Sequence, residues 1–248
     1  LAVECGGSDA SSGLAANPAV GVAADKLIED GGTVMFGETQ EMTGTQHILA
    51  NRAVNKETSD AIYDIIETQM ARQKAMGISS RWMSKGNIDG GLTTIEEKSL
   101  GAVVKGGTKP IQGVLYNNWD RFDTPKKPGL YLMDGPGWDV PSVTHMVAAG
   151  AQVVCFTSGR GSTTGHAIAP VIKITGNPTT YANMSDNIDI NAGTILDGAE
   201  SLSSVGGRIH DMIVKTANGR QTKAEALGYQ DYIVFRRSRE AEHLLGHC

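Results

Sequence analysis

The sequence comprises 248 residues, of which 40% are hydrophobic and 20% are charged, and it contains 31 glycines and 8 prolines. These values are typical of a globular chain with many tight backbone passages, and they exclude a collagen-like or disordered protein. A net charge of −5 removes the positive field that binds phosphate backbones. We therefore expect no nucleic-acid partner, and an anionic ligand must meet a local basic site.

The three cysteines, Cys5, Cys155 and Cys248, are too few and too widely spaced for a disulfide framework or a structural zinc site. They indicate a reducing, cytoplasmic setting. No apolar run approaches the roughly 20 residues that cross a bilayer, so we expect no membrane partner. The chain begins at Leu1, without methionine and inside a strand-like apolar run, which indicates a piece of a longer protein.

The first half of the chain alternates strands with helices. The predicted elements are strands over residues 1–5 and 33–37 and helices over residues 19–27, 58–76 and from Thr93 or Thr94 to Val104. Asn17 is the expected N-cap of the first helix, with Pro18 at its first position. A strand, a helix and a strand in this order favour a parallel pair with a right-handed crossover. Residues 77–92 are expected to be irregular.

The second half repeats this alternation after a polar loop. Residues 116–128 are rich in Asn, Asp, Lys and Pro, and we interpret them as a linker between residues 1–115 and residues 129–235. Strands are expected over residues 129–133, 152–156 and 171–174, and helices over 140–149 and 205–216. The sequence thus predicts an α/β fold: an open, mostly parallel sheet flanked by helices in a Rossmann-like three-layer arrangement, with the option of two subdomains and a tail at residues 236–248.

Three polar loops follow predicted strands, and loops at the carboxyl ends of parallel strands carry the ligand site in such folds. They are Cys5-Gly6-Gly7-Ser8-Asp9, the stretch from Glu38 to Glu41 that leads to His47, and residues 157–163 around Arg160. Each also has a structural interpretation. A lone cysteine is more often a buried apolar residue, carboxylates are favoured at helix starts, and glycine-rich loops are common. Neither the P-loop pattern nor the Gly-x-Gly-x-x-Gly spacing of dinucleotide-binding loops is present.

Taken together, the loops predict a metal site beside a carboxylate clamp. The predicted metal ligands are Cys5, Glu38, Glu41 and His47, a donor set that suits Fe(II) or Mn(II) better than magnesium. We expect Cys5 and His47, with Glu38 or Glu41, to approach one another. The predicted substrate-binding residues are Gly159, Arg160, Gly161, Ser162 and Thr163, in which the guanidinium suits a carboxylate held in bidentate fashion. A metal and such a clamp serve β-elimination from a hydroxy acid, because proton loss builds an enediolate and the hydroxyl must leave.

The same residues resemble a known family. The matching stretches are Cys5 to Asp9, Asn17-Pro18, Glu38/Glu41/His47 followed by Arg52, Gly90 to Leu92, Glu96 to Gly101, Phe156 to Gly161, and Asp189 to Gly193. In this order they look like altronate and galactarate dehydratases, from Leu1 to about Ile233. That family also includes the large subunit of (2R)-sulfolactate sulfo-lyase.

The resemblance implies an iron- or manganese-dependent lyase that removes water from a sugar acid and gives a 2-keto-3-deoxy acid. It also implies a missing amino-terminal domain or small subunit, and we expect the assembled enzyme to be a homo-oligomer. The candidate catalytic residues are Arg160, Lys98, Ser8 and Asp9. Lys98 is a candidate general base, although a solvated helix charge is the commoner fate of such a lysine. Residues 162–166 depart from the Thr-Pro that many family members have after the glycine loop, which leaves the substrate open.

Other functions fit the same residues. Release of sulfite from sulfolactate uses the same enolisation with another leaving group. A non-catalytic anion-binding module would need only the Arg160 loop and no iron or manganese, and a piece lacking part of the active site would fold but be inactive. We interpret His145, His210, His243 and His247 as structural or surface groups. The amine of Lys173, within an apolar strand, is expected to reach a carboxylate or the end of the sheet.

Overall fold

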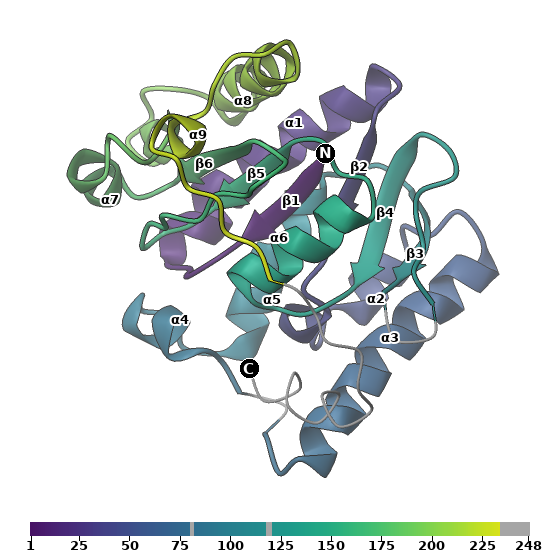
Figure 1. The fold of residues 1–248 in the computed structure, drawn as a ribbon. Helices are drawn as coiled ribbons and strands as arrows, with labels where there is room; N and C mark the ends of the chain where they lie inside the picture. Colours follow the sequence, from purple (N-terminus) through teal and green to yellow (C-terminus); the bar gives the residue numbers. More distant parts are fainter. Residues whose placement is uncertain (80–81, 118–120, 234–248) are drawn as a thin grey trace.

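The computed structural model describes residues 1–79, 82–117 and 121–233. They form a seven-stranded sheet in which every pair of neighbouring strands is parallel, with helices on both faces (Figure 1). The predicted open three-layer α/β fold is therefore confirmed. None of the described helices is both long and apolar enough to cross a membrane.

The strands are β1 Ala2–Cys5, β2 Thr33–Phe36, β3 Ile111–Tyr116, β4 Gly129–Asp134, β5 Val154–Thr157, β6 Val171–Thr175 and β7 Ile190–Asn191, in the spatial order β3-β4-β2-β1-β5-β6-β7. The α-helices are α1 Asn17–Glu29, α2 Gln46–Ala50, α3 Lys56–Ala75, α4 Lys85–Asp89, α5 Ile95–Val103, α6 Asp139–Ala148, α7 Pro178–Asn183, α8 Leu202–Ala217 and α9 Lys223–Ala226. A π-helix, η1, spans Ser12–Ala16, and 3₁₀ turns η2, η3 and η4 span Thr39–Met42, Val104–Gly106 and Gly193–Ile195.

The two predicted halves of the chain share this one sheet. Strand β4, from the second half, lies between β3 and β2, which both come from the first half. The predicted linker at residues 116–128 joins two neighbouring strands, β3 and β4, so it does not coincide with a break in the sheet.

Both faces of the sheet are covered, which explains why the central strands are almost entirely apolar. Successive residues of a strand point to opposite faces. Val3 and Phe36 belong to the core under α1, α3 and α8, whereas Ala2 and Met35 belong to the core under α6 and α9. Figure 1 shows α6 on the near face and α1 with α8 behind the sheet.

Strand β1 lies at the point where the chain reverses its direction across the sheet. Helix α1 carries the chain from β1 to β2 on one face, and α6 carries it from β4 past β1 to β5 on the other. Ligands bind at such switch points, beyond the carboxyl ends of the strands. Helices α4 and α5 lie beyond this edge in Figure 1.

The predicted N-cap at Asn17 is wrong. The helix begins earlier, because Asp9 Oδ1 accepts the backbone N–H of Ser12 at 3.2 Å, and π-helix η1 runs directly into α1. Asn17 is buried inside the helix. Its side chain accepts from Thr157 Oγ1 at 2.5 Å and donates to the carbonyl of Gly101 at 2.8 Å. Asn17 therefore ties the ends of β5 and α5 to α1.

Strand β3 and helix α4 are among the elements that the sequence patterns did not predict. Strand β3 follows Pro110 and contains Gly113, and it lies at the sheet edge, where its apolar pattern is weak. Helix α4 has only five residues within the stretch expected to be irregular. The predicted start of α5 is confirmed, because Thr94 accepts the backbone N–H of Glu97 at 3.2 Å.

Candidate functional site

The ends of β1 and β2 bring Cys5 and Glu38 together. Cys5 is the last residue of β1, and Glu38 follows β2 by two residues. Glu38 has a φ of 73°, and no other non-glycine residue in the described ranges has a positive φ. Such a backbone costs about 1–3 kcal/mol and persists where its surroundings fix it. Here the N–H of Cys5 donates to Glu38 Oε2 at 3.1 Å, so the strained turn directs the carboxylate to the end of β1.

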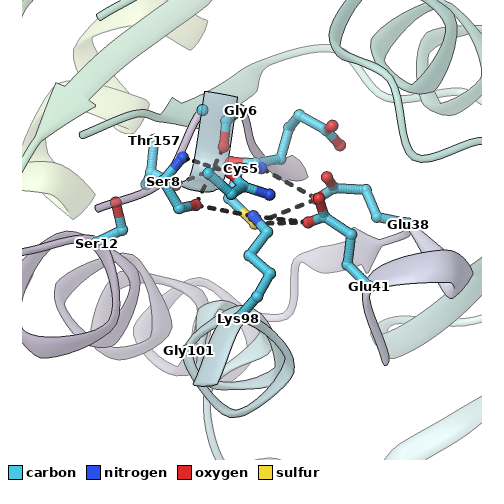
Figure 2. A network of polar contacts seen from close by, with 12 residues as sticks. Cys5, Gly6, Ser8, Ser12, Glu38, Glu41, Lys98, Gly101 and Thr157 are labelled. Atoms are coloured by element: carbon cyan, nitrogen blue, oxygen red, sulfur yellow. Dashed lines mark hydrogen bonds and ion pairs between the residues drawn. The ribbon is translucent and has the colours of Figure 1, made fainter. Parts of the chain in front are cut away.

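Five largely buried side chains meet at this point, and we call them the Cys5 cluster: Cys5, Glu38, Glu41, Lys98 and Lys105. The Cys5 sulfur lies 3.4 Å from Glu38 Oε2 and 3.7 Å from Glu41 Oε2. It also lies 3.4 Å from the Lys98 amine and 3.0 Å from the Lys105 amine. Lys98 pairs with Glu41 at 2.7 Å, and Lys105 pairs with Glu38. Figure 2 shows Cys5, both carboxylates and Lys98 converging.

The two lysines come from one side of α5 and its extension. Lys98 lies in α5 and Lys105 in η3, seven residues later, which is about two helical turns. Both are buried, at 2% and 0% exposure, so the alternative of a solvated charge at Lys98 is wrong. Sequence reasoning missed Lys105. One sequence signal could have revealed it: Lys105 follows Lys98 by seven residues, which places it on the helix face that also buries Ala102.

The Cys5 cluster carries opposite charges held out of water. Burial would raise the pKa of Glu38, but Lys105 and Lys98 outweigh burial and lower that pKa below its ordinary value. Burial lowers and the anionic neighbours raise the pKa of each lysine, and the neighbours prevail. Burial also raises the pKa of Cys5 to about 12, so Cys5 is a thiol at neutral pH.

The free energy of unfolding of the metal-free chain should depend on pH because of Glu41. Burial raises the pKa of Glu41 from 4.5 to about 8, although Lys98 opposes the shift. Between these values the folded chain binds more protons than the unfolded chain, so stability falls as pH rises. We expect wild type to lose up to a few kcal/mol more than Glu41→Gln between about pH 5 and pH 8, since one pKa unit is worth about 1.4 kcal/mol. Urea unfolding in the presence of a chelator measures this, and parallel profiles for the two proteins would contradict it.

A cavity of about 300 Å³ adjoins the Cys5 cluster. Its walls include Ser8, Asp9, Leu14, Leu92, Lys98 and Leu100. Lys98 belongs to both the cavity and the cluster, and its amine donates to Ser8 Oγ at 2.8 Å. A ligand in this cavity therefore meets a buried ammonium and a hydroxyl that are already joined to the thiol and carboxylates behind them.

Close backbone contacts hold the loop that carries Ser8. Asn87, buried in α4, accepts the N–H of Ser8 at 2.8 Å. A Cβ at Gly90 would lie 2.2 Å from the carbonyl oxygen of Ser8, so only glycine permits this approach. The Gly90-Gly91-Leu92 stretch thus fixes one wall of the cavity.

In the glycine loop around Arg160, the backbone N–H groups of Gly159 and Arg160 are already paired and do not point to an anion site. The N–H groups of Gly159 and Arg160 both donate to the carbonyl of Gly7, at 3.0 and 3.2 Å. The Arg160 stem packs on Gly7, and its guanidinium donates to the Gly86 carbonyl at 3.4 Å and lies 3.9 Å from Asp89. The Arg160 side chain remains 44% exposed. Its guanidinium is therefore only weakly engaged, beside the loop that lines the cavity.

The other residues predicted for substrate binding or catalysis have mostly local partners. A Cβ at Gly159 would meet the Asp9 carboxylate, and one at Gly161 would meet Met184. Ser162 Oγ donates to Thr164 Oγ1 at 2.8 Å, and Thr163 is exposed. Asp9 accepts from Ser12 and from Asn177, at 3.2 and 2.8 Å, so it braces the loop while lining the cavity.

The structure does not bring His47 to the metal-ligand group. Among the described residues, the ligand atoms of Cys5, Glu38 and Glu41 lie within 4.8 Å of one another, and His47 is exposed on α2 outside this group. The sequence placed His47 after the Glu38 loop, but α2 turns its side chain to solvent. The expected meeting of His47 with the other three is therefore wrong for this structure.

Lys173 also departs from expectation. It is 2% exposed, its amine makes no hydrogen bond in the described structure, and it lies 5.0 Å from the centre of the Tyr229 ring. It therefore reaches an aromatic face rather than a carboxylate. His210 pairs with Asp30 at 2.8 Å, and His145 is partly buried in α6. His243, His247 and the predicted tail at residues 236–248 lie outside the described residues.

Three donors of the Cys5 cluster fit a divalent cation. A thiol and two carboxylates, whose ligand atoms lie within 4.8 Å of one another, suit Fe(II) or Mn(II). The same donors already contact the ammonium groups of Lys98 and Lys105. These two ammonium groups balance part of the negative charge of the carboxylates.

Comparison with known proteins gives a consistent result. The family model for the carboxy-terminal region of D-galactarate/altronate dehydratase matches residues 1–240. The chain is 41% identical over 240 residues to the (2R)-sulfolactate sulfo-lyase subunit beta of Chromohalobacter salexigens, which covers 95% of this chain and 61% of the relative.

Two further relatives are dehydratases. The chain is 39% identical over 223 residues to the galactarate dehydratase (L-threo-forming) of Escherichia coli, covering 89% of this chain and 42% of that protein. It is 33% identical over 238 residues to the altronate dehydratase of Bacillus subtilis, covering 95% and 47%. The chain thus spans between 42% and 61% of the length of these relatives.

Proposed function

The chain belongs to the D-galactarate/altronate dehydratase family, and on that basis we propose that it is the carboxy-terminal catalytic part of a lyase that removes water from a sugar acid. The product is a 2-keto-3-deoxy acid. The observation that carries this proposal is the position of Lys98, whose amine joins the Cys5 cluster to the cavity. Buried charge in contact with a cavity is typical of catalytic sites.

The cavity residues support enolisation of a hydroxy acid. A base takes the proton at C2, which builds negative charge on the substrate. The electron pair then forms the C2–C3 double bond, and the hydroxyl at C3 leaves with the C–O electron pair and takes up a proton to become water. Because Cys5 and the two carboxylates raise the pKa of Lys98 above its ordinary value, its amine holds a proton and would stabilise that charge rather than act as the general base. Ser8 Oγ accepts from Lys98, which fixes the direction of the ammonium.

A metal ion is part of the proposal. Cys5, Glu38 and Glu41 would hold Fe(II) or Mn(II), which when bound supplies Lewis acidity for the departing or enolising oxygen. Arg160 would bind the substrate carboxylate, because its guanidinium is half exposed and weakly paired beside the Ser8 loop. Its planar fork matches a carboxylate.

Arg160→Lys is expected to be nearly as damaging as Arg160→Ala. An ammonium keeps the charge but not the two parallel donors, and losing a charge-assisted hydrogen bond costs roughly 1.5–3 kcal/mol, or about tenfold to hundredfold in kcat/KM. Kinetics and thermal melts on the same preparations measure this. If Arg160 only ties its loop to Gly86 and Asp89, both variants will instead melt earlier and keep near-normal kcat/KM per folded molecule.

A second lyase activity is supported by one observation. The relative that is 41% identical is a sulfolactate sulfo-lyase subunit, and it is the relative of which this chain covers the largest share among those compared above. Elimination of sulfite uses the same enolisation. An anaerobic assay of the full-length protein with Fe(II) or Mn(II) separates the two, since sugar acids give a 2-keto-3-deoxy acid and sulfolactate gives sulfite. No turnover of either class by a folded, metal-loaded protein would instead support a non-catalytic anion-binding module.

We also propose that a further domain or a small subunit completes the active site. The relatives are longer than the matched region, and one is called a subunit, which supports a further domain or small subunit that completes the active site. Activity of a full-length form, but not of these 248 residues alone, would establish that requirement.

Two buried cysteines, Cys5 and Cys155, are free thiols, which supports a reducing, cytoplasmic location. We also propose a homo-oligomer, which sedimentation of the full-length protein tests.

A further inference from the structure

Lys105 occupies an unusual place in the Cys5 cluster. Its side chain is fully buried, its amine lies 3.0 Å from the Cys5 sulfur, and it pairs with Glu38 Oε2. Unlike Lys98, it does not line the cavity. Its described partners are therefore two of the three side chains that could hold a metal ion.

An ammonium and a metal ion compete for the same two groups, the Cys5 sulfur and the Glu38 carboxylate. A cation bound by Cys5 and Glu38 would lie close to the Lys105 amine, and like charges a few ångströms apart inside a protein repel strongly. A buried carboxylate must in turn be paired, because leaving it uncompensated is costly. Lys105 thus satisfies Glu38 when no metal is bound and opposes a metal when one arrives.

We propose that Lys105 is a built-in cation that competes with the metal for Cys5 and Glu38 and so sets how tightly the site binds a divalent ion. This inference rests on the metal site proposed above and adds a role for a lysine outside the cavity. Loading the site requires the Lys105 amine to move away from the sulfur and from Glu38. Lys105 is therefore a positioning residue rather than one that touches substrate.

Cobalt(II) binding tests the role without an activity assay. The full-length protein, in wild-type form and as Lys105→Met and Lys105→Gln, is titrated anaerobically with Co(II), and the near-ultraviolet absorption of a cobalt–thiolate bond reports binding at Cys5. Glutamine is included because its amide still donates to Glu38 if the methionine variant folds poorly. Lys109→Met is the matched control, since it removes one positive charge from a lysine paired with Glu29 at the surface.

We expect Kd for Co(II) to fall about tenfold or more in both Lys105 variants and to stay unchanged in Lys109→Met. Co(II) should also raise the Tm of Lys105→Met more than that of wild type, because the metal then replaces the missing buried charge. Equal Kd values in wild type and the Lys105 variants would overturn the inference. Absence of the thiolate band from every protein would also overturn it, because no metal would then bind at Cys5.

The outcome is separable from that of the proposed function. Turnover of a sugar acid or sulfolactate by the same wild-type preparation decides whether the protein is a lyase. Tighter Co(II) binding in the Lys105 variants without such turnover supports the competition and contradicts the lyase. Turnover with no change in Kd supports the lyase and contradicts the competition.

Discussion

Lys98→Met is expected to lower kcat/KM by about a hundredfold or more, because a group that transfers a proton or stabilises charge in the transition state contributes roughly 10²–10⁴-fold. Methionine matches the length of the lysine stem but removes the ammonium that links Ser8, Glu41 and the Cys5 sulfur. KM should change less than kcat, since the effect lies in the charge that develops during reaction. Steady-state kinetics on sugar acids measures both.

The matched control is Lys173→Met. Lys173, on β6, is an equally buried lysine, but its amine lies over the Tyr229 ring, and it belongs neither to the cavity nor to the Cys5 cluster. The Lys173→Met variant should keep near-normal kcat. If Lys98→Met folds and retains kcat within a few-fold of wild type, Lys98 is only a structural counter-ion to Glu41.

Glu38→Gln is expected to produce the largest loss of stability. The substitution keeps the shape and the positive φ of residue 38 but leaves the ammonium of Lys105 buried without its anion. Breaking a buried pair by removing one partner costs about 3–5 kcal/mol. The Tm of the metal-free protein should therefore fall by several degrees, as differential scanning calorimetry measures.

Glu29→Gln provides the comparison at the surface. Glu29 pairs with Lys109, but the Glu29 side chain is 60% exposed, so water replaces the lost partner and the Tm should hardly change. Equal melting of the Glu38 and Glu29 variants would show that the Glu38–Lys105 pair does not carry this stability.

The fold was predictable because its strands and helices carry strong local patterns. Apolar runs at β1, β2, β4, β5 and β6 and the helical spacing of α3 were found from the sequence, since each pattern lies within about 20 residues. Strand β3 was missed because Pro110 directly precedes it and Gly113 interrupts its apolar pattern. The position of β4 between β3 and β2 depends on pairing between distant segments, which no local pattern reports.

The site was predictable only where its residues follow strand ends. Cys5, Glu38 and Glu41 were placed together because parallel strands β1 and β2 end at one edge of the sheet. His47 was placed there by its closeness in sequence, but helix α2 directs it to solvent. Lys105 was missed because it comes from a helix about 100 residues from Cys5 in the chain, and only folding brings the two within 3.0 Å.

We propose that this site enolises a hydroxy acid by removing the proton at C2, and deuterium incorporation into the product is a direct test. The full-length, metal-loaded protein is incubated with sugar acids and with sulfolactate in D₂O, and the product is examined by NMR. Because the enol takes its new proton from solvent, we expect one deuterium at C3 of the product for either leaving group, and none with Lys98→Met beyond its residual rate. A product that carries no deuterium at C3 would mean that the hydrogen moves internally from C2, and it would contradict enolisation at this site.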